Sequence, residues 1–89
     1  MKSRRTRRFR EMYNALPKVA RDQADEAYRL WRENPYHPSL HFKSLPGLGP
    51  RVWSARAGSI HYRAVGEFVA SDVFLWQWIG SRQDFDQLG

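Results

Sequence analysis

Two apolar stripes with helical spacing occupy the first third of the chain. The first consists of Phe9, Met12, Tyr13 and Leu16, and the second of Ala20, Ala24, Ala27, Tyr28 and Trp31. Such repeats every three or four residues predict helices that each bury one face. Pro17 ends the first helix and opens the second, because the residue before a proline avoids helical backbone whereas the first helical position tolerates proline. Asn34-Pro35 ends the second helix, so the sequence predicts a helical hairpin.

Beyond residue 38 the apolar period shortens to two, which indicates extended chain. Alternating apolar and polar side chains predict three strands, at 39–45, 52–57 and 60–64. A fourth strand is predicted over Val73–Ile79, where the run is almost entirely apolar. Because such runs are typical of strands buried on both faces, we expect this strand in the interior of the sheet.

Glycine, proline and serine mark the connections between these strands. Residues 46–50 (PGLGP) and Gly58-Ser59 form two turns, and Gly66-Glu67 with Ser71-Asp72 bracket the next one. Connections this short make successive strands antiparallel neighbours. Gly80-Ser81 ends the last strand, and we expect Ser81 to cap a short helix over 82–88.

The pattern predicts a single α+β domain over residues 1–89, with an N-terminal helical hairpin packed on a four-stranded antiparallel sheet and a short C-terminal helix. The absence of Cys excludes disulfides, a thiolate zinc site and a cysteine nucleophile. His and Asp show no metal-ligand spacing, and the sequence has no glycine loop for phosphates, so we expect neither metal nor cofactor. With no apolar run near the ~20 residues of a membrane span, we expect a cytoplasmic protein without membrane contact.

The net charge of +6 is concentrated in two zones. Residues 1–10 hold six basic residues and no acid, and residues 1–8 form a basic arm whose order or flexibility the sequence leaves open. Two interpretations of this arm stay open: a solvated tail, or a contact with RNA or a protein partner. Residues 36–66 hold four Lys or Arg and all three His, again without an acid. Positive zones of this kind indicate an anionic partner, most often nucleic acid.

Arg56 and Arg63 fall on adjacent predicted strands with the same outward parity. Two guanidinium groups on one sheet face can converge on one phosphate, because their paired N–H donors match phosphate oxygens. Histidines on the same face exchange protons near neutral pH. This set suffices for metal-independent RNA cleavage, in which the 2′-hydroxyl attacks the adjacent phosphodiester. A solvated polar face that keeps the sheet soluble is the alternative, and residue types alone do not exclude it.

Three segments resemble the RelE/ParE toxin superfamily, in the order typical of that family. They are Asn34–Leu45 (NPYHPSLHFKSL), Val52–Arg56 followed by His61–Ala64, and Trp76–Gly80 followed by Asp84-Phe85-Asp86. The resemblance covers nearly the whole chain. It implies a small α+β toxin of a type II toxin–antitoxin system, silenced by a cognate antitoxin protein. Members of the RelE branch cut messenger RNA on the ribosome, whereas ParE-like members inhibit DNA gyrase and are not nucleases.

The resemblance also implies roles for individual residues. Arg63 matches the arginine that contacts the scissile phosphate, and Arg56 lies on the strand that supplies further cations. Arg82 and His37 fall at or near positions that carry catalytic side chains in some members. The residues expected to contact RNA are His41, Lys43, His61 and Phe85.

Two departures from the family pattern keep the alternatives open. Arg82 replaces a more common His, and Phe85 replaces Tyr. Neither exchanges protons at neutral pH, so proton transfer falls to His37, His41, His61 or the ribosome. We therefore expect an mRNA endonuclease that arrests growth. A gyrase inhibitor without nuclease activity, or a weakened relative that only binds antitoxin or nucleic acid, remains the alternative.

Overall fold

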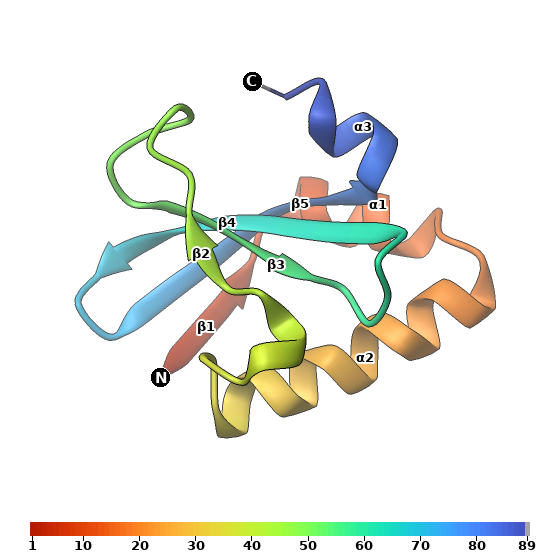
Figure 1. The fold of residues 1–89 in the computed structure, drawn as a ribbon, viewed down its shortest axis with the longest axis horizontal. Coiled ribbons are helices and arrows are strands. Elements are labelled where there is room, and N and C mark those ends of the chain that lie inside the picture. The colour runs from red at the N-terminus through yellow and green to blue at the C-terminus, as the bar shows by residue number, and fades with distance from the viewer. Residues whose placement is uncertain (89) are drawn as a thin grey trace.

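The computed structural model describes residues 1–88, which form a mixed five-stranded sheet with the two N-terminal helices on one side (Figure 1). In chain order the elements are β1 (Lys2–Arg5), α1 (Arg7–Asn14), α2 (Lys18–Glu33), the 3₁₀ turn η1 (Pro38–Leu40), β2 (Lys43–Ser44), β3 (Val52–Arg56), β4 (Tyr62–Ala70), β5 (Val73–Ser81) and α3 (Arg82–Asp86). The strand order across the sheet is β1-β5-β4-β3-β2. Strands β2 to β5 pair antiparallel, and β1 pairs with β5 in parallel.

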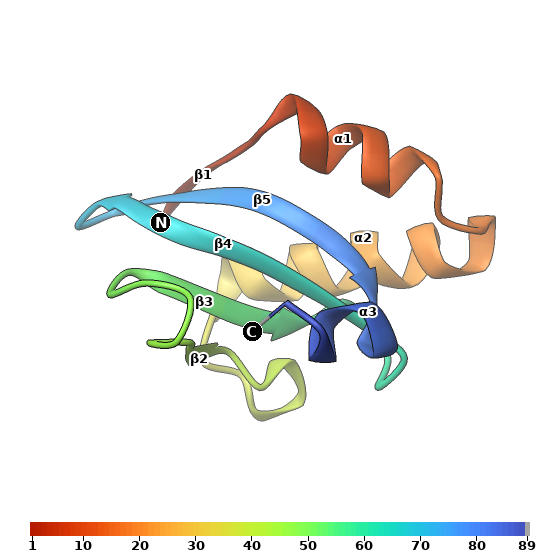
Figure 2. The same cartoon turned by 90° about the horizontal axis from the view of Figure 1, so that it is seen from above.

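The predicted helical hairpin is confirmed. The Thr6 side chain caps α1 by accepting a hydrogen bond from the Phe9 amide at 3.0 Å. Pro17 stands at the N-terminal boundary of α2, and the Asn34 amide closes its last turn by donating to the Leu30 carbonyl at 2.9 Å. Figure 2 shows both helices on the same side of the sheet, with α1 at the β1–β5 edge.

An aromatic cluster joins α2 to the sheet. Trp31 of α2 is 1% exposed, and its ring centroid lies 5.1 Å from Trp76 and 5.5 Å from Phe74, both on β5. Phe42, between η1 and β2, packs edge-on against Trp31 at 5.8 Å. Trp and Phe side chains bury large apolar areas, so this cluster is the principal source of stability in a chain of 89 residues.

The predicted four antiparallel strands are joined by a fifth strand, which the basic N-terminal arm forms. Residues 2–5 form β1 at the edge of the sheet, and the Lys2 amide donates to the Asp72 carbonyl at 2.9 Å. The hydroxyl groups of Ser3 and Tyr28 share a hydrogen bond that ties β1 to α2. The sequence KSRR has no apolar alternation, so its strand forms only because β5 offers a free edge.

Two further boundaries differ from the prediction. Residues 39–45 do not form a continuous strand, because Pro38 begins η1 and His41 ends it in left-handed backbone at φ +46°, which leaves only the short β2. The expected turn at Gly66-Glu67 lies within β4, which runs from Tyr62 to Ala70. A Cβ on Gly66 would lie 2.4 Å from the Leu75 carbonyl oxygen, so this glycine permits close strand packing rather than a turn.

The predictions for the C-terminal strand and helix agree with the structure except at one boundary. The strand expected over Val73–Ile79 is β5, which lies between β1 and β4 and so is an interior strand as predicted. Ser81 caps α3 by accepting from the Asp84 amide at 3.1 Å. Helix α3 ends at Asp86, slightly short of the expected residue 88.

Candidate functional site

The sheet has a helix-covered face and an opposite face, which we call the open face. Trp53, Ala55 and Ala57 of the β3 region join the core under the helices. Their alternate neighbours Ser54 and Arg56 therefore lie on the open face, as the sequence predicted. Lys43 is directly opposite Ser54 across the β2–β3 ladder, so it shares that face.

Arg56 and Arg63 are direct cross-strand partners on β3 and β4. The Ala57 amide donates to the Tyr62 carbonyl at 3.1 Å, so the neighbouring Arg56–Arg63 pair is of the type without mutual backbone hydrogen bonds. In such pairs the side chains approach closely, with Cβ atoms about 4.5–5.5 Å apart. Two like charges in this position destabilise a sheet unless an anion neutralises them.

The electrostatics of Arg63 show which other groups converge on the pair. Burial lowers the pKa of Arg63, and the nearby Arg56 and Arg82 lower it further, whereas Asp86 acts in the opposite direction. Arg82 and Asp86 both come from α3, which the Ser81 cap fixes at the end of β5. Arg82 on α3 is therefore close enough to the Arg56–Arg63 pair to act on Arg63 electrostatically.

His41 faces the same group of cations. The neighbouring Arg56 is the main cause that lowers the pKa of His41, with smaller contributions from desolvation, Arg63 and Lys43. The left-handed backbone at φ +46° directs this exposed side chain from the end of η1. Since the ordinary histidine pKa is near 6.5, the lowered value keeps the imidazole neutral at pH 7 and able to accept a proton.

One donor of Arg56, its buried Nε atom, has no hydrogen-bond partner in the described part of the chain. An unsatisfied buried donor costs about 1–3 kcal/mol, more when it is charged. A phosphate bound between Arg56 and Arg63 would supply acceptors to both guanidinium groups and remove their repulsion.

An apolar wall borders the cationic cluster. Trp78 is 8% exposed and lies on the open face, where its ring centroid is 6.3 Å from that of Phe85 on α3. A Cβ on Gly80 would lie 2.9 Å from the Trp78 ring, so the glycine gives the indole its space. Since Gly80 is the partner of Arg63 on β5, the Trp78–Phe85 pair stands directly beside the cations, and the half-buried Phe85 ring is its more exposed member.

The structure brings most of the predicted site residues together. Arg56, Arg63, Arg82, His41 and Lys43 share one electrostatic environment on the open face. The His61 carbonyl accepts from the Arg82 amide at 2.8 Å, which places His61 at the start of α3. His37 caps the start of η1, and its ring Nδ1 lies 2.8 Å from the Ser39 hydroxyl.

Sequence reasoning assigned no site role to Trp78, Gly80 or Asp86. Their contributions depend on the strand register and on the position of α3. The pattern Trp-Ile-Gly before a capped helix was the available signal, but it does not reveal which face the indole takes. A register shift between Val65 and Gly66 puts Trp76 and Trp78 on opposite faces, although two-residue spacing normally keeps them together.

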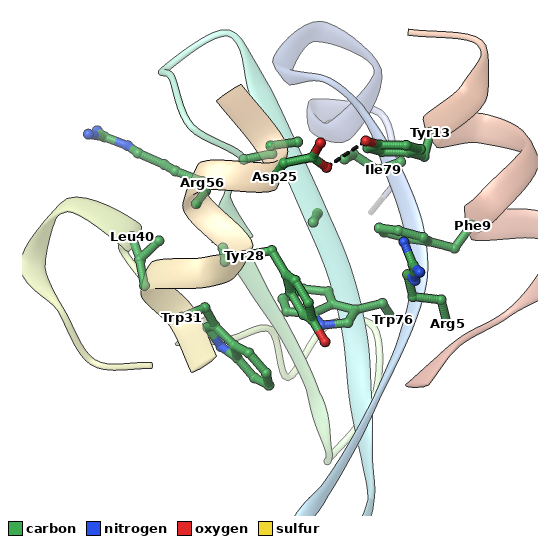
Figure 3. Close-up of a pocket in the computed structure, with 15 residues that line it drawn as sticks. Arg5, Phe9, Tyr13, Asp25, Tyr28, Trp31, Leu40, Arg56, Trp76 and Ile79 are labelled. Carbon is green, nitrogen blue, oxygen red and sulfur yellow. Dashed lines mark hydrogen bonds between the residues drawn. The ribbon is translucent and has the colours of Figure 1, made fainter. Parts of the chain in front are cut away.

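A small cavity of about 60 Å³ lies on the other side of the sheet, under the helices (Figure 3). Five alanines contribute to its lining, together with Trp31 and Trp76, whose indole N–H groups are buried without an acceptor in the described part of the chain. In Figure 3 the Arg56 side chain points away from the cavity, and Tyr13 donates a hydrogen bond to Asp25 beside it. The cavity therefore belongs to the core, and Arg56 borders both the cavity and the cationic cluster.

Two searches of residues 1–88 gave negative results. No group of three or more His, Cys, Asp or Glu side chains in this part of the chain is arranged to hold a metal ion. No helix there has the length and apolar character needed to cross a membrane.

Comparisons with known proteins identify the fold. No protein-family profile and no curated protein sequence matches the chain. Among solved structures, a chain of the RelB–RelE antitoxin–toxin complex from Methanococcus jannaschii superimposes with a TM-score of 0.71 at 16% identity, covering 96% of this chain and 98% of that one. The chain has the RelE fold.

Two other RelE structures also superimpose on this chain. The archaeal RelE–RelB complex from Pyrococcus horikoshii OT3 matches with a TM-score of 0.68 at 18% identity, over 91% of this chain and 93% of that one. The isolated E. coli RelE toxin matches with a TM-score of 0.65 at 16% identity, over 90% and 82%. The RelE fold agrees with the fold that the resemblance implied, and it confirms the predicted α+β class.

Proposed function

We propose that this protein is the toxin of a type II toxin–antitoxin pair and a metal-independent, ribosome-dependent mRNA endonuclease that inhibits translation. The cross-strand pair Arg56–Arg63, with His41 facing it, is the observation that carries the proposal. The RelE fold supports it, because the matched structures are a RelE toxin and a RelB–RelE antitoxin–toxin complex.

The proposed reaction is transfer of the RNA phosphodiester to its own ribose. The 2′-oxygen bonds to phosphorus, the bond from phosphorus to the 5′-oxygen breaks, and a cyclic phosphate remains. His41 takes the proton of the 2′-hydroxyl, and the leaving 5′-oxygen takes a proton from solvent. Arg63 and Arg56 stabilise the charge that develops on the phosphoryl oxygens, a contribution typically worth about 10²–10³ in rate for each donor.

The other proposed site residues act at the rim of this centre. Arg82 adds positive charge from α3 but exchanges no proton at neutral pH. Phe85 stacks on a base, while Lys43 and His61 bind the RNA backbone. His37 is the second candidate proton acceptor, and its hydrogen bond with Ser39 holds its ring at the start of η1.

Expression in the absence of an antitoxin tests the proposal. We expect growth arrest and new 5′ ends inside translated messages, mapped by primer extension. Arg63→Gln should abolish both, whereas Arg51→Gln, which makes the same charge change on an exposed turn residue, should retain them. New ends that persist with Arg63→Gln would refute the assigned role.

Histidine variants separate the two proton acceptors. His41→Asn should reduce cleavage by roughly 10²–10⁴-fold, the usual contribution of a general base, while His37→Asn should not. Asparagine suits the position of His41 because it tolerates left-handed backbone. The reverse ranking would transfer the role to His37.

A second candidate function follows from α3. This helix carries Arg82 and Phe85 where the family pattern has a proton-transferring His and Tyr, which favours a ParE-like inhibitor of DNA gyrase. Growth arrest with intact messages, together with loss of supercoiling by purified gyrase, would support this candidate over the nuclease. Expression without any arrest would indicate a relative that only binds antitoxin or nucleic acid.

We further propose that a cognate antitoxin protein binds and silences the toxin in the cytoplasm. Two of the structures matched above are complexes of RelE with the antitoxin RelB. An acidic antitoxin segment laid over the open face would neutralise Arg56 and Arg63 and block access of RNA to them.

A further inference from the structure

The cavity under the helices is lined by two hydrogen-bond donors that have no partner within residues 1–88. These are the indole N–H groups of Trp31 on α2 and Trp76 on β5. The two side chains are only 1% and 4% exposed. Since a buried donor without an acceptor costs free energy, the two indoles indicate a ligand that accepts hydrogen bonds.

The space arises from alanines on both layers of the fold. Helix α2 supplies two of them and the β3–β4 region three: Ala24, Ala27, Ala55, Ala57 and Ala64. Methyl groups facing each other do not fill the gap that the surrounding aromatic rings hold open. The walls are therefore almost entirely apolar, which suits a ligand with an apolar body.

The polar groups at the edge of the cavity already have partners. Tyr13 donates to Asp25 (Figure 3), and the hydroxyl groups of Tyr28 and Ser3 share a hydrogen bond. Asp25 is exposed, so the cavity reaches the surface between α1 and α2. Arg56 also carries an unpaired buried donor, but its side chain points away from the cavity. A ligand that enters from the surface therefore places its acceptor at the two indoles.

The volume and the lining limit the class of ligand. The cavity measures about 60 Å³. One water-sized group needs about 10–15 Å³ and benzene occupies an apolar cavity of about 150 Å³, so the space suits about four non-hydrogen atoms and excludes an aromatic ring. The charged residues that border it, Arg5, Asp25 and Arg56, are exposed or point away. An ion between alanine and aromatic walls would be costly to desolvate, so the ligand is neutral.

We propose that this cavity is a binding site for a small neutral carbonyl compound with about four non-hydrogen atoms. The carbonyl oxygen has two lone pairs, so it accepts from one indole N–H or from both. The apolar part of the ligand lies against the alanines. The site is separate from the proposed nuclease reaction, so a negative result for one leaves the other standing.

Acetone is the probe, and the indole groups of ¹⁵N-labelled protein report its binding. The chain has four Trp, and each Trp→Phe variant removes one indole signal from the ¹H–¹⁵N spectrum, which assigns all four. Trp53 and Trp78 do not line the cavity, so their signals are internal controls. A ligand of this size reaches a dissociation constant of about 40 µM at best, so the titration extends to tens of millimolar.

We expect acetone to shift the Trp31 and Trp76 signals with a saturating dependence on concentration. The Trp53 and Trp78 signals should stay nearly unchanged. Binding should weaken by about 3- to 10-fold in Trp31→Phe, in Trp76→Phe or in both, which corresponds to the loss of one hydrogen bond. Trp53→Phe is the matched control and should bind acetone as the wild type does.

A cavity-filling variant tests the location. Ala64→Val adds two methyl groups from β4 and should abolish the saturating shift. Ala70→Val makes the same change at an exposed position of the same strand and should preserve it. Thermal unfolding confirms that each variant is folded at the assay temperature, and Ala55→Val fills the cavity from β3 if Ala64→Val does not fold.

Three results would overturn the proposal. Shifts of all four indoles that grow linearly with acetone would show an effect of the solvent alone. Saturating shifts that persist in the filled variant would place the probe elsewhere. Xenon supplies the third comparison, because it enters apolar cavities without accepting a hydrogen bond. Binding of xenon without binding of acetone would show that the indole donors take no part and that the assigned class of ligand is wrong.

Discussion

Replacing Arg63 by Gln should stabilise the folded protein while it abolishes the proposed activity. Arg63 lies directly opposite Arg56, and burial together with the charges of Arg56 and Arg82 lowers its pKa. A lowered pKa for a cation means that the fold disfavours the charged form, so removing the charge relieves strain on the native state. A residue retained for stability would give the opposite result.

The expected gain in stability follows from the cross-strand pairing of Arg56 and Arg63. Like charges directly opposite each other in a sheet cost about 0.2–1 kcal/mol. Asp86 offsets part of the repulsion, and the hydrogen bond from Arg63 Nη1 to the Tyr62 carbonyl, at 3.4 Å, is long and contributes little. We therefore expect a gain of about 0.5 kcal/mol, or about 2–4 °C in Tm for a domain of this size.

Thermal unfolding at two ionic strengths measures this gain. The screening length falls from about 10 Å at 0.1 M salt to about 3 Å at 1 M, so the gain should be largely lost at the higher concentration. Arg51→Gln is the matched control for net charge and should change Tm little. A lower Tm for Arg63→Gln at low salt, or an equal rise for Arg51→Gln, would refute the reasoning.

Three further predictions concern stability. The lowered pKa of His41 means that the unfolded chain binds the proton more readily than the folded protein, so the contribution of neutral His41 to stability is complete above pH 6.5, the ordinary value, and is lost as pH falls below it. His41→Asn should remove this loss of stability at acid pH. Urea unfolding midpoints of the variant that vary with pH as in the wild type would contradict this. Gly80→Ala, whose new Cβ would lie 2.9 Å from the Trp78 ring, should cost about 1–3 kcal/mol. Gly47→Ala, with nothing within 4 Å, should be nearly neutral, and equal Tm values for the two would argue against the contact. Trp31→Ala should cost about 3–5 kcal/mol, whereas Trp31→Phe, which removes an unbonded indole N–H, should cost less than about 1.5 kcal/mol by chemical denaturation; similar losses for both would show that the indole itself is required.

The candidate site shows which side chains the alternation along a strand can place and which it cannot. Alternation placed Arg56 and Arg63 on one face of adjacent strands, and the register confirms that they are direct partners. The same argument does not apply to His41, because η1 interrupts the strand that was expected there and left-handed backbone aims the side chain. Periodicity describes regular elements, so it carries no information on a residue whose direction is set by a turn.

The sequence by itself determined the helical hairpin, the interior strand β5 and the capped α3, because each depends on local signals: apolar spacing, proline boundaries and a serine cap. Those signals act within a few residues, and neighbouring sequence is sufficient to specify them.

Only the tertiary structure decided the rest. The strand β1 forms because β5 presents unpaired backbone groups at its edge, although its own residues have little strand preference. The register shift beside Gly66 turns Trp78 away from the core and toward Arg63. Both depend on pairing between segments about 10 to 70 residues apart, and the energy of such pairing resides in contacts that no single segment contains.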